Sequence, residues 1–288
     1  MAIRARSVGE LLDGAFRLYR EDLGLYMFTA IVASVPMSLF TVLSLTASDT
    51  VGSTAAILVV LPFALLVTVA LWTALVHQMS ERLDGREPAF GPSVRRAVSL
   101  FLRVTWATIL ANVVLFGAMS VGIVLVTLVG FVGAFFLPPL VSVIVASVIG
   151  VAVMVLLGLR VLTGIVLFLP GIVVEGLTGF ESLKRSFALA KGGYLRILSA
   201  LVFAWILLLV PVLGAYFVTG TTRTLIDPEA ASSGVVGVGQ IVVQQLLVLI
   251  STGFTTPFLA ACILLLYFDQ RVRLEAYDLQ AEAEALAG

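Results

Sequence analysis

Histidine and cysteine each occur once in this chain of 288 residues, at His77 and Cys262, and only two residues are lysine. Because metal sites are built from clusters of histidine, cysteine and carboxylate ligands, the sequence predicts no metal and no other cofactor. It also contains no nucleophile elbow, no phosphate-binding glycine loop and no zinc-binding histidine pair. We therefore expect that the protein is not an enzyme.

Charged residues are scarce as well. They make up 12% of the chain, about half the share in a typical soluble protein, and the formal net charge is zero, which gives no overall field to attract nucleic acid. Hydrophobic residues make up 60% of the chain, and its mean hydropathy is +1.15. A soluble fold of this length cannot bury so much apolar surface, so we expect an integral membrane protein that has membrane lipids as partners.

The apolar residues form runs that are long enough to cross a membrane. A hydrocarbon core about 30 Å thick requires about 20 apolar residues of helix. Residues 104–170 contain just two strongly polar side chains, Asn112 and Arg160, and their length fits two helices broken between Gly130 and Pro139. The other runs are 23–45, 55–76, 197–218 and 241–268. The sequence thus predicts an all-α integral membrane protein with six transmembrane helices, in a single domain of residues 1–288.

The first run has an alternative interpretation as a cleaved signal peptide. Signal peptides carry a short basic segment followed by an apolar core of about 7–15 residues. The run at 23–45 is longer, and it follows a segment of mixed charge at 10–22. The pattern favours a transmembrane helix over a cleaved leader.

Basic residues lie almost entirely on one side of the predicted spans. The segments on that side are 1–22, 77–103, 171–196 and 269–288, and they hold 15 of the 17 lysine and arginine residues. Arg223 lies on the other side, and Arg160 lies within a span. Since basic residues mark cytoplasmic loops, we expect a protein of the cell membrane with both termini in the cytoplasm. The excess of arginine over lysine is typical of GC-rich genomes and favours a bacterial source.

Two of the cytoplasmic segments have a similar pattern. Ser7 stands three residues before Glu10, and Thr178 stands three residues before Glu181, which is the spacing of a capping box at the start of a helix. Apolar residues follow at helical spacing in both segments. Each pattern predicts an amphipathic helix at the membrane interface.

The middle segment, 92–100, follows this pattern more weakly, because Pro92 takes the place of the glutamate. The chain can then be divided into three repeats, each an interfacial helix followed by a helical hairpin. The predicted repeats are 7–78, 90–170 and 178–268, followed by a cytoplasmic extension at 269–288. The alternative is that any amphipathic helix before a span has this pattern, because the headgroup region selects basic residues and an apolar stripe.

Three stretches resemble one family. They are SVGELLDGAFRLYR at 7–20, LKRSF at 183–187 within the segment 160–192, and LLYFDQRVRLE at 265–275. They are similar to the membrane domain associated with bacterial glycerophosphodiester phosphodiesterases, in its free-standing form, although Ala276 stands where we expect glycine. The resemblance implies a six-helix membrane module. It does not carry over the enzymatic activity, because the catalytic barrel of those enzymes is not among these residues.

Arg160 is the candidate functional residue within the predicted spans. It lies ten residues before Pro170, about 15 Å along a helix, which places its charge inside the bilayer. Such a charge costs about 2.5–3.5 kcal/mol on insertion scales. We expect a structural ion pair with Glu175 or Asp269, the nearest acidic residues by predicted depth. The alternatives are that the side chain extends to the headgroups, or that it binds a ligand or an ion.

The end of the sixth predicted helix carries two acidic and two basic residues. Acid and base stand four residues apart in two pairs, which allows ion pairs within the helix. These pairs are Asp269–Arg273 and Arg271–Glu275. We expect them to dock the helix end against the first interfacial helix, through Glu10, Asp13 or Arg20. The residues expected to hold the cytoplasmic face together are Glu10, Asp13, Arg20, Glu181, Arg185, Arg271, Arg273 and Glu275.

Two functions fit these features. The first is a non-catalytic membrane module that organises a protein partner or lipids at the cytoplasmic face, as the interfacial helices and the charged extension suggest. The second is a transporter or channel for a small solute or a lipid that uses Arg160. Prolines within the apolar runs also favour transport, but membrane helices tolerate proline for structural reasons. These prolines are Pro36, Pro62, Pro211 and Pro257. The first function is our prediction.

Overall fold

The computed structural model describes residues 7–46, 54, 56–136, 138–226 and 237–275, and this part of the chain contains helices and no strand. Six of its helical segments are long and apolar enough to cross a membrane. They are Leu23–Leu45, Ile57–Leu83, Phe90–Gly133, Pro139–Glu175, Tyr194–Gly220 and Val238–Glu275. The prediction of an all-α, multi-pass membrane protein is confirmed.

The helices follow the predicted runs closely, with two differences. The helices are α1 (Val8–Glu21), α2 (Leu23–Thr46), the π-helix η1 (Ala56–Val60), α4 (Leu61–Leu83), α5 (Phe90–Gly133), α6 (Pro139–Ile165), α7 (Phe168–Glu175), α8 (Gly179–Ala190), α9 (Tyr194–Ile226) and α11 (Val238–Glu275). The first difference is that the middle segment forms no separate interfacial helix, because 92–100 is the start of the continuous α5. The second is that the fourth run is divided, so that α7 is a short helix of its own.

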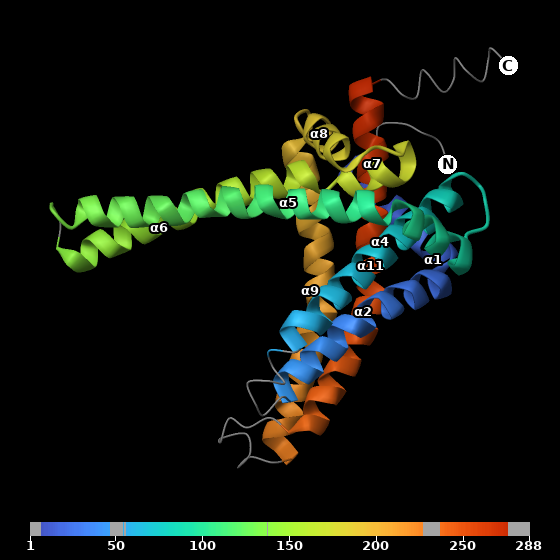
Figure 1. The fold of residues 1–288 in the computed structure, drawn as a ribbon, viewed down its shortest axis with the longest axis horizontal. Helices are drawn as coiled ribbons and strands as arrows, with labels where there is room; N and C mark the ends of the chain where they lie inside the picture. Colours follow the sequence, from blue (N-terminus) through green and yellow to red (C-terminus); the bar gives the residue numbers. More distant parts are fainter. Residues whose placement is uncertain (1–6, 47–53, 55, 137, 227–236, 276–288) are drawn as a thin grey trace.

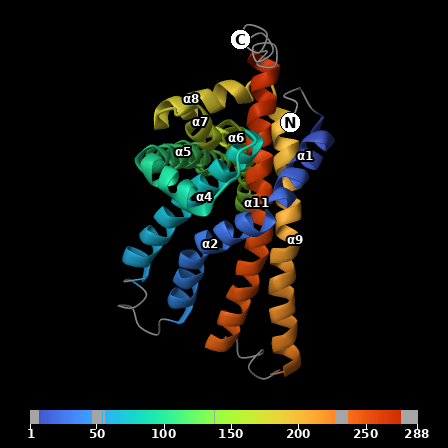
Figure 2. The ribbon, with the colours of Figure 1, turned by 90° about the vertical axis from the view of Figure 1, so that its right-hand side faces the viewer.

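The helices extend in two directions from a common region. Helices α2, α4, α9 and α11 run together in one direction, whereas α5 and α6 form a two-helix arm in another (Figures 1 and 2). Helices α1, α7 and α8 lie near the base of this arm (Figure 1). The middle hairpin therefore differs in direction from the hairpins α2–α4 and α9–α11.

The core lies where the two groups of helices meet. Fully buried side chains come from α1, α2, α4, α7, α8, α9 and α11. They include Leu11, Tyr26, Met79, Ile172 and Leu264. Burying a large side chain of this kind, compared with leaving it in water, stabilises the fold by about 1.5–3 kcal/mol. In the part of the molecule outside the lipid, these side chains therefore hold the helices together.

The arm is apolar over its surface. No charged residue lies between Arg103 and Arg160, and side chains such as Phe116 and Val148 are mostly exposed. The apolar part of α5, residues 104–133, is about 45 Å long at 1.5 Å per residue. This exceeds the thickness of the hydrocarbon core, and a bilayer accommodates such a helix by tilting, by kinking or by local thickening.

Small residues allow α5 and α6 to pack closely. A Cβ atom at Gly122 would lie 2.5 Å from Cβ of Met154, and one at Gly150 would lie 1.9 Å from a methyl group of Val126. Near the tip of the arm, the hydroxyl of Ser142 donates a hydrogen bond of 2.8 Å to the Gly130 carbonyl. Close approach of this kind is how helices associate in lipid, where burial of apolar surface gives little driving force.

Candidate functional site

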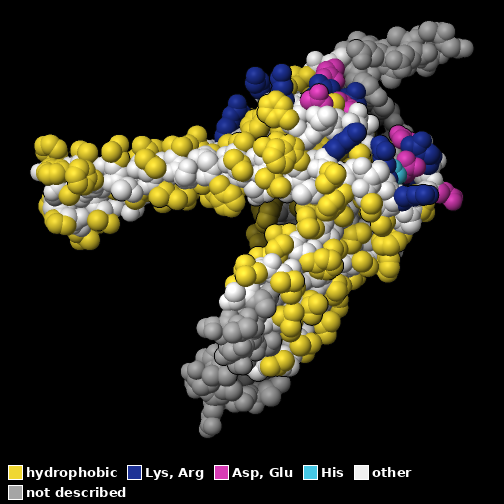
Figure 3. Space-filling view, in the orientation of Figure 1, with side chains coloured by type: hydrophobic (Ala, Val, Ile, Leu, Met, Phe, Trp, Pro, Cys, Tyr) yellow, Lys and Arg dark blue, Asp and Glu magenta, His cyan; other side chains and the backbone are white. Residues whose placement is uncertain are grey.

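The charged side chains of the described residues gather at one end of the molecule (Figure 3). This charged end is formed by α1, the end of α4, the start of α5, the helices α7 and α8, the start of α9 and the end of α11. The remaining surface in this view is mainly apolar. The candidate site is therefore built first from this charged end.

The first ion-pair network of the charged end joins α7, α8 and α11. Glu175, the last residue of α7, accepts a hydrogen bond from the Tyr267 hydroxyl and lies 3.2 Å from Nε of Arg271. Arg185 of α8 lies 3.3 Å from the same carboxylate and donates to both oxygens of Glu275. The pKa of Arg185 is raised, mainly by its hydrogen bonds to Glu275. The network thus neutralises its charges internally.

The second network joins α9 and α11 through Asp269. This carboxylate is 3% exposed, and one of its oxygens accepts hydrogen bonds from Nε of Arg196 at 2.8 Å and from Nε of Arg273 at 3.1 Å. The neighbouring residue Gln270 is also buried and lies against Gly193, where a Cβ atom would come within 2.5 Å of its amide nitrogen. The turn before α9 is therefore packed directly on the end of α11.

The spacing along α11 explains why there are two networks. Residues four apart lie on the same face of a helix. Tyr267, Arg271 and Glu275 form one such row, and it faces α7 and α8. Asp269 and Arg273 form a second row, which pairs with Arg196 of α9. The intrahelical pairs were predictable from the sequence, whereas Tyr267 and Arg196 were not predicted, although the four-residue spacing from Tyr267 was a usable signal.

The prediction that these charges dock on the first interfacial helix is wrong for the pairs that the structure describes. Their partners are on α7, α8 and α9, because α1 meets α11 further from its end, through aromatic contacts of Phe16 and Tyr19 with Phe258. Glu10 instead completes the capping box of α1. Asp13 is exposed on α1, and the guanidinium of Arg20 lies 5.8 Å from the Phe16 ring centre.

Glu181 has the same role in α8 as Glu10 has in α1. Its carboxylate accepts hydrogen bonds from the Thr178 backbone N–H at 3.1 Å and from the Thr178 hydroxyl at 2.7 Å. These hydrogen bonds lower the pKa of the Glu181 carboxyl. Both predicted capping boxes are therefore present.

Arg160 is not ion-paired with Glu175 or Asp269 in the described part of the chain, contrary to the prediction. Its side chain is exposed, and its guanidinium lies 4.9 Å from the ring centre of Tyr194, the first residue of α9. Tyr194 immediately follows the turn that packs on the charged end. The structure therefore places Arg160 beside the charged end, and the two carboxylates are held by other guanidinium groups.

The predicted fourth span is broken between α6 and α7, a few residues after Arg160. Continuous helix would have carried Arg160 about 15 Å from Pro170, but α6 ends at Ile165. Ser186 of α8 is fully buried and stabilises the break. Its hydroxyl donates a hydrogen bond of 2.6 Å to the Gly164 carbonyl and accepts one of 3.1 Å from the Leu167 N–H. These are backbone groups that a helix break otherwise leaves without partners.

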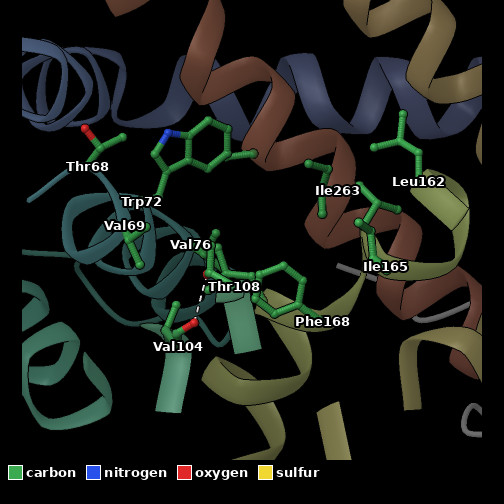
Figure 4. A pocket seen from close by; sticks show the side chains of 13 residues that line it. Thr68, Val69, Trp72, Val76, Val104, Thr108, Leu162, Ile165, Phe168 and Ile263 are labelled. Carbon is green, nitrogen blue, oxygen red and sulfur yellow. Dashed lines mark hydrogen bonds between the residues drawn. The ribbon is translucent and has the colours of Figure 1, made fainter. Parts of the chain in front are cut away.

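An apolar cavity of about 320 Å³ lies where the arm leaves the other helices (Figure 4). It is lined by α4, α5, α11 and the segment that joins α6 to α7. The lining residues are Thr68, Val69, Trp72, Val76, Val104, Thr108, Leu162, Ile165, Val166, Phe168, Leu169, Ala260 and Ile263. This cavity was not predicted, because it forms between segments that lie up to 195 residues apart in the chain.

The chemistry that this arrangement offers is association, through paired charges and an apolar cavity. The carboxylates of Glu175, Asp269 and Glu275 are each held by guanidinium groups. Within the described ranges, no group of three or more histidine, cysteine, aspartate or glutamate residues is placed to hold a metal ion. Comparisons of the chain with family models, with curated proteins and with solved structures find no match.

Proposed function

We propose that this protein is a non-catalytic module of the bacterial cell membrane, which organises lipids, and through them a protein partner, at the cytoplasmic face. Both termini lie in the cytoplasm in this proposal. The observation that carries it is the collection of charges of the described residues at one end, while the rest of the described surface in this view is mainly apolar (Figure 3). Basic residues near the inner leaflet attract anionic lipids by about 1 kcal/mol each.

The start of α5 supports a role in binding lipid headgroups. Arg95 and Arg96 are exposed and form no ion pair with another described residue. They line a surface groove of about 540 Å³ together with Gly91, Pro92 and Ser99. Their charges are thus available to lipid phosphates, unlike those of Arg185 and Arg271, which are committed to carboxylates within the molecule.

The alternative, a transporter that uses Arg160, has less support. Arg160 is exposed beside Tyr194. The apolar cavity of about 320 Å³ is not lined by Arg160. The resemblance to the membrane domain associated with glycerophosphodiester phosphodiesterases is also a proposal, which is carried by the three sequence stretches. It agrees with a membrane module.

The proposed function predicts that anionic lipids are enriched around the protein. In vesicles of mixed anionic and zwitterionic phospholipids, spin-labelled anionic lipid should associate with the native protein more strongly than zwitterionic lipid. The double substitution Arg95→Gln and Arg96→Gln should remove up to about 2 kcal/mol of this preference. The double substitution Arg95→Lys and Arg96→Lys should retain it, because the attraction depends on charge.

Two results would contradict the proposal. One is an equal association of both lipids with the native protein. The other is a solute flux through proteoliposomes that requires the native protein and is lost in Arg160→Leu, since this would support the transporter.

A further inference from the structure

We propose that the apolar cavity at the base of the arm binds one acyl chain of a membrane phospholipid. This inference rests on the proposed function and names the class of ligand that the module takes. The cavity is formed by four segments that separate where α5 and α6 leave the other helices (Figures 1 and 4). Each of these segments belongs to a helix that is apolar and long enough to cross a membrane.

The walls of the cavity favour a hydrocarbon occupant over water. Its two hydroxyl groups already donate hydrogen bonds to backbone carbonyls. The Thr68 hydroxyl donates a hydrogen bond of 3.1 Å to the Ala33 carbonyl. The Thr108 hydroxyl donates one of 2.8 Å to the Val104 carbonyl (Figure 4). A buried water needs two to four polar partners, and apolar cavities without them stay dry and accept apolar ligands.

The cavity is open to the outside, because lining residues such as Trp72, Leu162 and Ile263 are partly exposed. Its volume of about 320 Å³ is far larger than that of one water. An acyl chain can therefore enter the cavity and fill it without requiring a polar partner.

The position of the cavity also suits a lipid whose headgroup stays at the charged end. Arg103 directly precedes the cavity residue Val104, and it is exposed. One of its nitrogens donates to the Gly176 carbonyl at 2.9 Å. A guanidinium group has five N–H donors, so others remain for a lipid phosphate at the same depth as this end of the cavity.

Trp72 allows this proposal to be tested by fluorescence. A protein with Trp106→Phe and Trp205→Phe keeps Trp72 as its single tryptophan, and both replaced residues are about half exposed. This protein, in detergent micelles, is titrated with a phospholipid that carries bromine atoms on its acyl chains. We expect quenching of Trp72 that saturates at a low mole fraction of lipid, since bromine in the cavity is in contact with the indole.

A filled cavity should abolish this saturable quenching. Thr108→Phe places a ring in the cavity, whereas Thr127→Phe makes the same change on an exposed part of the same helix. We expect loss of the saturable component in Thr108→Phe and its retention in Thr127→Phe. Thermal unfolding must show that both variants remain folded; a variant that does not fold is replaced by Ile165→Phe or Val113→Phe, respectively.

Other outcomes would overturn the proposal in a recognisable way. Quenching that rises in proportion to brominated lipid, equally in both variants, would mean that Trp72 meets lipid in general and that the cavity has no chain of its own. Such a result would leave the enrichment of anionic lipids by Arg95 and Arg96 untouched. Conversely, saturable quenching together with no preference for anionic lipid would support the cavity and remove the proposed function.

Discussion

Replacing Asp269 by asparagine is expected to lower the free energy of unfolding by about 3 kcal/mol. Removing one partner from a buried ion pair costs roughly 3–5 kcal/mol, because it leaves the other charge uncompensated. Asp269 is 3% exposed and holds both Arg196 and Arg273. We expect the lower end of that range, because the side chain of Arg273 is 37% exposed and keeps part of its hydration.

Asp84→Asn is the matched control for this prediction. Asp84 forms an ion pair of 2.7 Å with Arg86, but both side chains are more than half exposed. Exposed pairs contribute about 0–1 kcal/mol. Unfolding of the purified proteins by a denaturing detergent, followed by circular dichroism, measures both changes. Equal losses of stability in the two variants would show that Asp269 does not join α9 to α11 as described.

Replacing Gly122 by leucine is expected to destabilise the arm by about 1–3 kcal/mol. Overpacking of a close contact has this cost. A Cβ atom at Gly122 would lie 2.5 Å from Cβ and 3.0 Å from Cα of Met154, so the backbones of α5 and α6 would have to separate. The same unfolding experiment applies here.

Gly117→Leu gives the control on the same helix, since a Cβ atom at Gly117 meets nothing within 4 Å. Leucine also favours helix by roughly 0.5–1 kcal/mol over glycine. This substitution should therefore leave the stability unchanged or raise it. A stabilising effect of Gly122→Leu as large as that of Gly117→Leu would be incompatible with close packing of the arm.

The spans could be predicted from the sequence because the requirement for them is local. A run of about 20 apolar residues satisfies the bilayer whatever its neighbours are. The predicted runs 23–45 and 241–268 lie within α2 and α11, and the predicted break between Gly130 and Pro139 separates α5 from α6. The capping boxes at Ser7 and Thr178 were predictable for the same reason, since they join residues three apart.

The break between α6 and α7 could not be predicted, because it depends on a contact between distant segments. The break after Ile165 is held by Ser186, which belongs to α8. Local sequence gave no signal for it, since glycine and threonine near position 164 are common in membrane helices. Arg196, the partner of Asp269 on α9, was missed for the same reason.

Cysteine labelling from the two sides of the membrane tests the central claim most directly. Glu87→Cys and Lys184→Cys place exposed thiols at the charged end, while the native Cys262 is buried. A membrane-impermeant maleimide should label both positions in inside-out membrane vesicles and neither in intact cells. Labelling of either position from outside intact cells, or recovery of the native chain in the soluble fraction without detergent, would contradict a lipid-embedded protein whose charged end faces the cytoplasm.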